Sequence, residues 1–123
     1  MSLRVLVVED DLDSLELMTY LFRAFGHDVV GASEGDSALR LAVEKPPYLI
    51  LCDLRLPGMD GFELLGKLKS LPALGSIPVI AVTAYAMPGD RERVLNAGFD
   101  GYVSKPIDPR TFVREAEELS TRH

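Results

Sequence analysis

The sequence predicts a doubly wound α/β fold, a (βα)5 chain whose parallel five-stranded sheet carries helices on both faces. Short apolar runs rich in β-branched residues alternate five times with longer segments whose apolar residues recur every three or four positions. The links between these segments are short. Regular alternation with short links favours parallel strands connected by helices that pack on both sides of the sheet.

The five short apolar runs are the predicted strands. They lie at Leu3–Val8, Val29–Ala32, Leu49–Cys52, Pro78–Val82 and Tyr102–Val103. The first, third and fourth are almost continuously apolar, as inner strands are when helices cover both faces. The second contains Gly31, and the fifth is short and flanked by Gly101 and Ser104. We therefore expect the second and fifth strands at the edges, which the flavodoxin-like order 2-1-3-4-5 provides.

Five helices are predicted between and after the strands. Three of them have apolar stripes at helical spacing, formed by Leu12, Leu15, Met18, Phe22 and Phe25, by Phe62, Leu65 and Leu68, and by Phe112, Ala116 and Leu119. Shorter stripes rich in alanine predict two further helices near residues 35–44 and 88–97.

Several helix ends are indicated by capping residues. The predicted N-caps are Asp11, Asp60 and Asp108. Pro109 would occupy the first position of the last helix, where its missing N–H costs nothing. Gly26 and Gly98 are expected directly after the first and fourth helices. Residues 46–47 and 56–58 contain proline and are predicted loops.

Length and composition exclude several classes of protein. The 123 residues fit a single domain spanning 1–123. Lys and Arg number 13 against 19 Asp and Glu, and this net charge of −6 argues against direct binding of nucleic acid or anionic membranes. The single cysteine favours a reducing compartment. No apolar run approaches the roughly 18 residues of a membrane span. We expect a cytoplasmic protein without membrane insertion, as a monomer or weak dimer.

Polar side chains follow the predicted strands at one edge of the sheet. Glu9 and Asp10 follow the first strand, Asp53 the third, Thr83 the fourth and Lys105 the fifth. Ligands of open α/β sheets bind at the carboxyl ends of the strands, where the strand order reverses. Neighbouring strands lie about 4.8 Å apart. Asp10 and Thr83 should therefore flank Asp53, with Lys105 reaching back from one strand further away.

The charges of this group favour a divalent cation and a phosphoryl group. The three carboxylates carry about −3 together, and crowding makes their ionisation costly. Mg²⁺ and the Lys105 ammonium group would neutralise them, and carboxylate oxygens are ligands that Mg²⁺ accepts. A carboxylate neutralised in this way is a suitable phosphoryl acceptor. Mg²⁺, Lys105 and the Thr83 hydroxyl would each stabilise one oxygen of the transferred group.

Four short strings resemble those of response-regulator receiver domains. They are Val7–Asp11, Cys52–Gly61, Val82–Ala84 and Ser104–Pro106, which occur in the order and spacing of that family. Each string alone is a weak indication, whereas four in register are highly specific, and the resemblance covers essentially the whole chain. It implies a regulatory domain that assists only its own phosphorylation and dephosphorylation and is not otherwise an enzyme.

The resemblance also implies cofactors and partners. The cofactor would be Mg²⁺, with Mn²⁺ as a substitute. A sensor histidine kinase or a histidine phosphotransfer protein would donate the phosphoryl group from a phosphohistidine, and a downstream effector or output domain would respond. The chain would be a stand-alone receiver, a phosphorelay intermediate or part of a longer protein.

The resemblance assigns roles to the acidic residues. Asp53 matches the phosphoacceptor, Asp10 the direct metal ligand, and Glu9 a partner that often acts through water. The backbone carbonyl of Arg55 matches a further metal ligand. Spacing alone leaves open whether Glu9 and Asp10 or Asp10 and Asp11 form the acidic pair. The family register favours the first pair and leaves Asp11 as a helix cap.

The remaining roles concern a conformational switch. Thr83 and Lys105 match the switch hydroxyl and the salt-bridging lysine, Tyr102 matches an aromatic switch position, and the Lys105–Pro106 bond matches one that is commonly cis. Phosphorylation would draw Thr83 toward the phosphoryl group, and Tyr102 would occupy the vacated space. The fourth helix, fifth strand and fifth helix would then change their packing. Partners are expected on that face, which includes Met87, Arg91, Tyr102 and Arg110.

Other polar residues carry weaker expectations. Strand alternation turns Cys52 into the core, away from the acceptor. The Arg55 side chain either lies near the acceptor entrance, where it would hinder water or contact the phosphoryl group, or is an exposed loop arginine. We expect His27 and His123 to take no part in the site. The acidic run Glu115, Glu117 and Glu118 is expected to be a solvated helix face.

Two functions of other classes compete with a phosphorylation switch. A phosphohydrolase with an aspartyl-phosphate intermediate typically carries a second acid two residues after its nucleophile, where this chain has Arg55, and its nucleophile follows the first strand. A nucleotide or flavin module needs a phosphate cradle after the first strand, where residues 9–13 are mostly acidic. A degenerate receiver that binds partners without phosphorylation is a third alternative, but every site position is filled.

Overall fold

The computed structural model of the chain describes residues 3–84 and 88–121 and contains one parallel sheet. Its strands run in the order β2-β1-β3-β4-β5, which confirms the predicted order and both edge strands. The strands are β1 (Arg4–Val8), β2 (Asp28–Ala32), β3 (Leu49–Cys52), β4 (Val79–Thr83) and β5 (Gly101–Ser104). Each end of these strands either agrees with the predicted end or differs from it by one residue.

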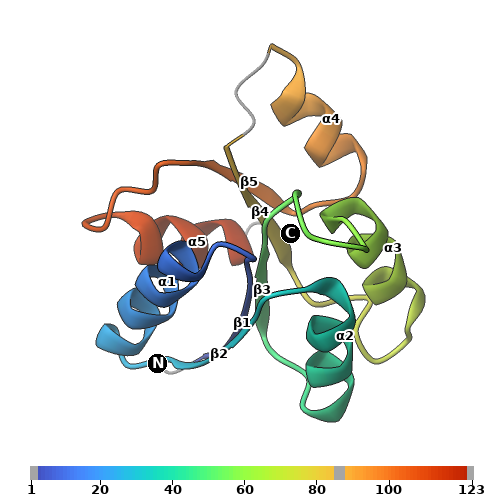
Figure 1. Cartoon of the computed structure of the whole chain (residues 1–123), viewed down its shortest axis with the longest axis horizontal. Coiled ribbons are helices and arrows are strands. Elements are labelled where there is room, and N and C mark those ends of the chain that lie inside the picture. Colours follow the sequence, from blue (N-terminus) through green and yellow to red (C-terminus); the bar gives the residue numbers. More distant parts are fainter. Residues whose placement is uncertain (1–2, 85–87, 122–123) are drawn as a thin grey trace.

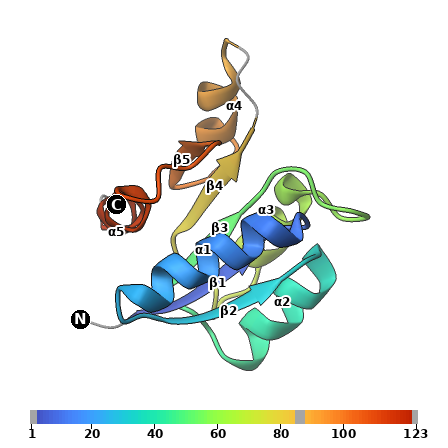
Figure 2. The same cartoon turned by 60° about the vertical axis from the view of Figure 1, so that its left-hand side comes forward.

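Five helices alternate with the strands, as the apolar stripes predict. They are α1 (Leu12–Ala24), α2 (Gly35–Glu44), α3 (Gly61–Ser70), α4 (Asp90–Asn96) and α5 (Phe112–Ser120). Helices α1 and α5 lie on one face of the sheet, and α2 and α3 lie on the other (Figures 1 and 2). None of the helices in the described ranges is both long and apolar enough to cross a membrane.

Strand alternation divides the apolar side chains between two cores. On β1, Val5 and Val7 pack with residues of α1 and α5, whereas Leu6 and Val8 pack with residues of α2, α3 and α4. All four side chains are almost completely buried. Both faces of an inner strand therefore need apolar residues, which explains the continuous apolar runs in the sequence. Cys52 lies in the second of these cores, as predicted.

The predicted caps are confirmed at two helices and wrong at the third. The Asp11 and Asp60 carboxylates accept the backbone N–H groups of Ser14 and Glu63, at 3.2 and 2.9 Å. Helix α5 instead begins at Phe112. Asp108 starts a preceding turn, in which its side chain accepts the backbone N–H of Arg110 at 3.0 Å and pairs with the Arg110 guanidinium.

Two glycines end helices in the left-handed region, as expected. Gly26 has a φ of 86° directly after the C-cap of α1, and Gly98 has a φ of 115° directly after that of α4. Other residues are strained in this conformation, whereas glycine adopts it readily.

The end of the sheet where the strands begin contains a buried histidine, and we call its contacts the His27 cluster. His27 Nδ1 accepts the backbone N–H of Leu3 at 3.0 Å, and Nε2 lies 2.7 Å from the Glu117 carboxylate of α5. Its ring contacts that of Phe22, with 5.8 Å between the centroids. The prediction of a solvated acidic face is therefore wrong for Glu117, because α5 packs this residue against the histidine.

Candidate functional site

Asp53 is the central residue of the carboxyl edge of the sheet. It follows β3, which lies between β1 and β4, and only 7% of its surface is exposed. Its Oδ1 accepts the backbone N–H of Arg55 at 3.0 Å, and its Oδ2 accepts a hydrogen bond from Lys105 Nζ at 2.8 Å. The strand order and these two bonds hold the carboxylate in one orientation.

Lys105 links Asp53 to a second buried acid. It follows β5 and reaches across the sheet edge to form ion pairs with both Asp53 and Glu9. Glu9 is fully buried and also accepts the backbone N–H of Asp11 at 3.1 Å. The Lys105–Pro106 peptide bond is cis, as the resemblance implies. Residues 9, 53 and 105 are thus brought together as predicted from the strand ends.

Burial changes the proton affinity of this group. Removal from water raises the pKa of Glu9 to about 7, and the Asp53 charge adds to this effect, although bonds from Lys105 and the Asp11 N–H oppose it. Burial also disfavours the charged form of Lys105, but hydrogen bonds to Asp53 and Glu9 outweigh it and raise the pKa of the ammonium group. The single ammonium group of Lys105 thus pairs with two buried carboxylates, and the negative charge of the group exceeds its positive charge.

A third acid brings the group to a composition that suits a cation. One carboxylate oxygen each of Glu9, Asp10 and Asp53 lie within 4.8 Å of one another. Asp10 is exposed, whereas the other two are buried. Oxygen ligands and an excess of negative charge fit a hard divalent cation such as Mg²⁺, which keeps several of its waters when few protein ligands are present. The exposed side of Asp10 leaves room for them.

Thr83 and Tyr102 lie on the neighbouring strands β4 and β5. Thr83 ends β4 and is fully buried, and its backbone carbonyl accepts the N–H of Lys105 at 2.9 Å. Tyr102 is half-buried on β5, opposite Ala81 of β4. Burial raises the pKa of the Tyr102 phenol, and the charge of nearby Asp90 on α4 raises it further. The roles of Thr83 and Tyr102 in a switch stay predictions.

Close packing behind Asp53 explains a glycine of the Cys52–Gly61 string. A Cβ atom on Gly61, the first residue of α3, would lie 2.6 Å from the backbone oxygen of Asp53 and 2.8 Å from the Leu54 Cα. Backbone atoms cannot move aside as a flexible side chain can. Gly61 therefore lets α3 start against the loop that orients the Asp53 carboxylate.

An open pocket forms the entrance to the acidic group. Its lining includes Asp10, Arg55, Asp60, Phe62 and Arg93. The Arg55 side chain lines this entrance, as one interpretation of the residue expects, and it is also exposed, as the other expects. The position of Arg55 therefore does not decide between the two. The position of Arg93 at this entrance is not predicted from the sequence. Its guanidinium lies 5.3 Å from the ring centroid of Phe62, a contact between α4 and α3 that no local sequence pattern reveals.

Cys52 is unsuited to redox chemistry despite its position beside Asp53. Complete burial raises the pKa of its thiol, and the charges of Asp53 and Glu9 raise it further. A thiol that stays protonated is a poor nucleophile. Two other residues of the sequence analysis, Met87 and His123, lie outside the described residues.

Comparisons with known proteins agree with this geometry. A model of the response regulator receiver domain matches residues 5–117. The polar-differentiation response regulator DivK of Brucella ovis is 42% identical over 113 residues, which cover 92% of each chain. The receiver domain of a sensor histidine kinase from Pseudomonas aeruginosa, solved with a magnesium ion in its active site cleft, is 30% identical with a TM-score of 0.87, covering 97% of this chain and 98% of that one.

The fold is shared more widely than the sequence. The chemotaxis response regulator CheY4 of Vibrio cholerae has a TM-score of 0.90 over 97% of this chain and 99% of its own, at 23% identity. The five-stranded order and the alternating helices are therefore common to proteins with few identical residues.

Proposed function

The chain belongs to the response regulator receiver domain family, and from this membership we propose that Asp53 accepts a phosphoryl group and thereby sets a signalling switch. The observation that carries the proposal is the contact of Asp53 with Lys105, beside Glu9 and Asp10. A carboxylate alone at a strand end would be an ordinary solvated group. This carboxylate is buried, oriented and joined to the charges that phosphoryl transfer requires.

The donor in this proposal is a phosphohistidine of a sensor histidine kinase or a histidine phosphotransfer protein. A carboxylate oxygen of Asp53 attacks the phosphorus, the new O–P bond forms as the P–N bond of the donor breaks, and the imidazole nitrogen keeps the bonding electron pair. Lys105 stabilises the negative charge on the transferred oxygens. The Thr83 hydroxyl, at the end of the neighbouring strand, would contact another of these oxygens.

Metal binding is proposed at the same acidic group. Asp10 and Asp53 would hold Mg²⁺ through their carboxylates and Glu9 would act through water, with the Arg55 carbonyl as a further ligand and Mn²⁺ as a substitute. The bound ion would supply positive charge to the transferred oxygens. Asp10 is the exposed member of the group and is the proposed direct ligand, whereas the buried Glu9 orients Lys105 and acts on the ion through water.

The switch is proposed to act through the face formed by α4, β5 and α5. Movement of Thr83 toward the phosphoryl group would let Tyr102 turn inward, and the packing of α4 would follow. Phosphorylation shifts the equilibrium between the two arrangements only if the phosphoryl group interacts more favourably with one of them. Among the described residues, Arg91 of α4 and Tyr102 of β5 belong to this face and Arg110 lies in the turn before α5. A downstream effector or output domain would bind there.

A regulatory role is favoured over independent catalysis. The position two residues after Asp53 holds Arg55, where aspartyl-phosphate hydrolases typically have a second acid, and Asp53 follows the third strand rather than the first. We further propose a single receiver domain over residues 1–123, in the cytoplasm, as a monomer or weak dimer that contacts neither nucleic acid nor membrane directly.

The proposal is tested by the intact mass of the protein after incubation with acetyl phosphate, with Mg²⁺ and with a chelator. The expected result is the addition of one phosphoryl group only with Mg²⁺, and no addition to Asp53→Asn. An unmodified wild-type protein, or equal labelling of Asp53→Asn, would contradict the proposal.

A further inference from the structure

A second pocket lies at the opposite end of the sheet from Asp53, between edge strand β2 and helix α2. Its volume is about 250 Å³. The lining residues are Arg4, Leu6, Asp28, Val30, Leu41, Ala42, Glu44, Lys45 and Pro47. A pocket of this size holds roughly eight water molecules, or one ligand smaller than a typical drug. The proposed phosphorylation switch uses none of these residues.

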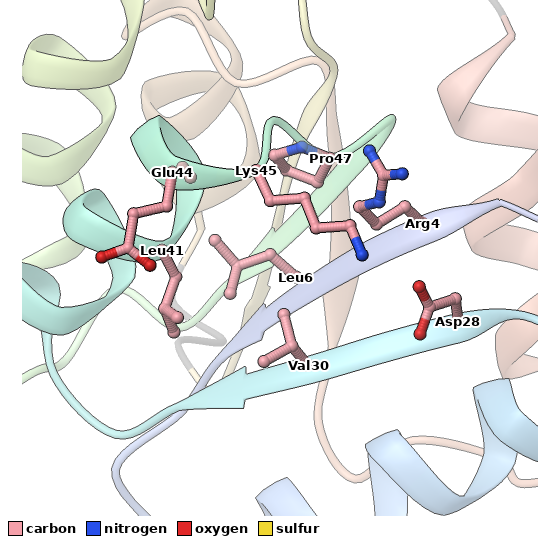
Figure 3. A pocket seen from close by; sticks show the side chains of 9 residues that line it. Arg4, Leu6, Asp28, Val30, Leu41, Glu44, Lys45 and Pro47 are labelled. Atoms are coloured by element: carbon pink, nitrogen blue, oxygen red, sulfur yellow. The ribbon is translucent and has the colours of Figure 1, made fainter.

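The pocket has an apolar floor and a charged end, and strand register fixes their separation. Leu6 of β1 pairs with Val30 of β2, and Arg4 pairs with Asp28 two residues earlier on the same strands. Two residues along a strand span about 6.6 Å. In the view of Figure 3, the Lys45 side chain extends from the C-cap of α2 toward the side of the pocket that carries Arg4 and Asp28. Two cations and one anion therefore gather at one end of the floor.

The charged residues of this pocket do not neutralise one another in ion pairs. Within the described part of the chain, Arg4, Asp28, Glu44 and Lys45 form no ion pair within 4.0 Å. Arg4 Nε is buried without a hydrogen-bond partner among the described residues. Charged side chains that lie near one another without forming an ion pair can each pair with a charged ligand, whereas a buried donor without a partner is unfavourable.

The position of Arg4 is fixed independently of any ligand. Its Nη1 donates a hydrogen bond to the Pro46 carbonyl at 2.9 Å, and its guanidinium lies 5.8 Å from the ring centroid of Tyr48. A cation already held in place loses little conformational entropy when an anion binds it. The charged end of the pocket is therefore partly preorganised.

From this arrangement we infer that the pocket binds a small zwitterion with a branched aliphatic chain, of the class of apolar α-amino acids. The carboxylate would lie between Arg4 and Lys45, the ammonium group beside Asp28, and the aliphatic chain on Leu6 and Val30. A simple anion would leave Asp28 unpaired, and a simple cation would be repelled by Arg4 and Lys45. A ligand with both charges complements this end of the pocket better than a ligand with either charge alone.

The test is an NMR titration of the ¹⁵N-labelled protein with L-leucine, 4-methylpentanoate, 3-methylbutylamine and glycine. The second and third probes keep the branched chain of leucine but carry one charge each, and glycine keeps both charges without the chain. We expect saturable shifts of the Val30, Leu41 and Lys45 amides with leucine. Each other probe should bind at least about tenfold more weakly, because it loses a charge contact or the apolar contact.

Two variants and a matched control locate the site. Lys45→Met should weaken leucine binding by about tenfold, whereas Lys67→Met, an exposed lysine of α3 outside the pocket, should not change it. Asp28→Asn should abolish the preference for leucine over 4-methylpentanoate. The same spectra show whether each variant is folded.

Several results would overturn the inference. They are the absence of saturable shifts, equal binding of leucine and the singly charged probes, and tighter binding of 4-methylpentanoate than of leucine to the wild-type protein. The titration uses unphosphorylated protein and reads no phosphorylation, so its outcome is independent of the proposed switch.

Discussion

The two ends of the sheet both bury ionisable side chains, but they balance them differently. In the His27 cluster, each ring nitrogen has one partner, the Leu3 N–H or the Glu117 carboxylate. At the carboxyl edge, the single ammonium group of Lys105 faces Glu9 and Asp53, with Asp10 close by. The first arrangement is satisfied by the protein alone, whereas in the second the carboxylates outnumber the ammonium group.

This difference separates structural burial from functional burial. A satisfied polar group in the interior stabilises the fold, and removing one partner costs free energy. An unbalanced group of acids lowers stability in the absence of a ligand and is retained where chemistry needs it. Substitutions at the two ends should therefore have opposite consequences for stability and for phosphorylation.

The largest expected effect is the loss of phosphorylation on removing the Lys105 ammonium group. Lys105→Met should lower the phosphorylation rate with acetyl phosphate on the order of 100-fold, because charge on the transferred oxygens loses its partner. Intact mass spectrometry over time gives the rate. Lys69→Met is the matched control. Lys69 forms a 3.2 Å ion pair with Asp100 and is not a partner of Asp53. A similar loss of phosphorylation rate in both variants would show that the effect is not specific to Lys105.

The next effect is a pH dependence of stability in the presence of a chelator. Burial raises the pKa of Glu9 from 4.5 to about 7, so the folded protein binds a proton that the unfolded chain has released between these values. The free energy of unfolding should therefore fall by about 3 kcal/mol as pH rises through this window. Urea unfolding at several pH values measures it.

The control for this pH dependence is Glu9→Gln, which cannot ionise. Its free energy of unfolding should change less between pH 4.5 and 7 than that of the wild-type protein. An identical fall in the two proteins would mean that Glu9 is not the group responsible.

A smaller effect on stability, without loss of phosphorylation, is expected at the His27 cluster. His27→Ala removes a buried ring that packs on Phe22 and leaves the Leu3 N–H without its acceptor. The free energy of unfolding should fall by about 2 kcal/mol. The phosphorylation rate of the folded variant should equal that of the wild-type protein. A large change in that rate would show that the two ends of the sheet are coupled.

The smallest effect concerns the helix that starts beside the acceptor loop. Asp60→Ala removes the carboxylate that accepts the Glu63 N–H at 2.9 Å, and should cost about 1 kcal/mol. Asp60→Asn keeps an acceptor oxygen and should cost less. Thermal unfolding of both variants measures the difference, and equal losses would argue against a capping role.

Much of the carboxyl edge could be predicted from the sequence, because its geometry follows from strand order. The glycine of the second strand and the short length of the fifth place these two strands at the edges of the sheet. The residues that follow the three inner strands must then lie side by side. Strand order thus predicts Asp53 between Asp10 and Thr83, whereas Lys105 follows edge strand β5 and reaches Asp53 through its long side chain. Spacing alone could not select between Glu9 and Asp11 as the partner of Asp10, and burial now distinguishes them, since Glu9 is buried and Asp11 is an exposed cap.

The contacts that sequence analysis missed join elements far apart in the chain. His27 and Glu117 are separated by 90 residues, and their pairing depends on how α5 docks against α1 and the start of β1. The cation–π contact of Arg93 with Phe62 likewise depends on the docking of α4 against α3. Asp108 was wrongly expected to cap α5, because a carboxylate that starts a turn has the same local sequence pattern as an N-cap.

The identity of the modified side chain tests the central claim most directly. Borohydride reduces an acyl phosphate to an alcohol, so an aspartate phosphorylated with acetyl phosphate and Mg²⁺ becomes homoserine, which peptide mapping by mass spectrometry locates. We expect homoserine at position 53 and at no other acid. Homoserine in place of Asp10, or an unmodified Asp53 peptide from phosphorylated protein, would contradict it.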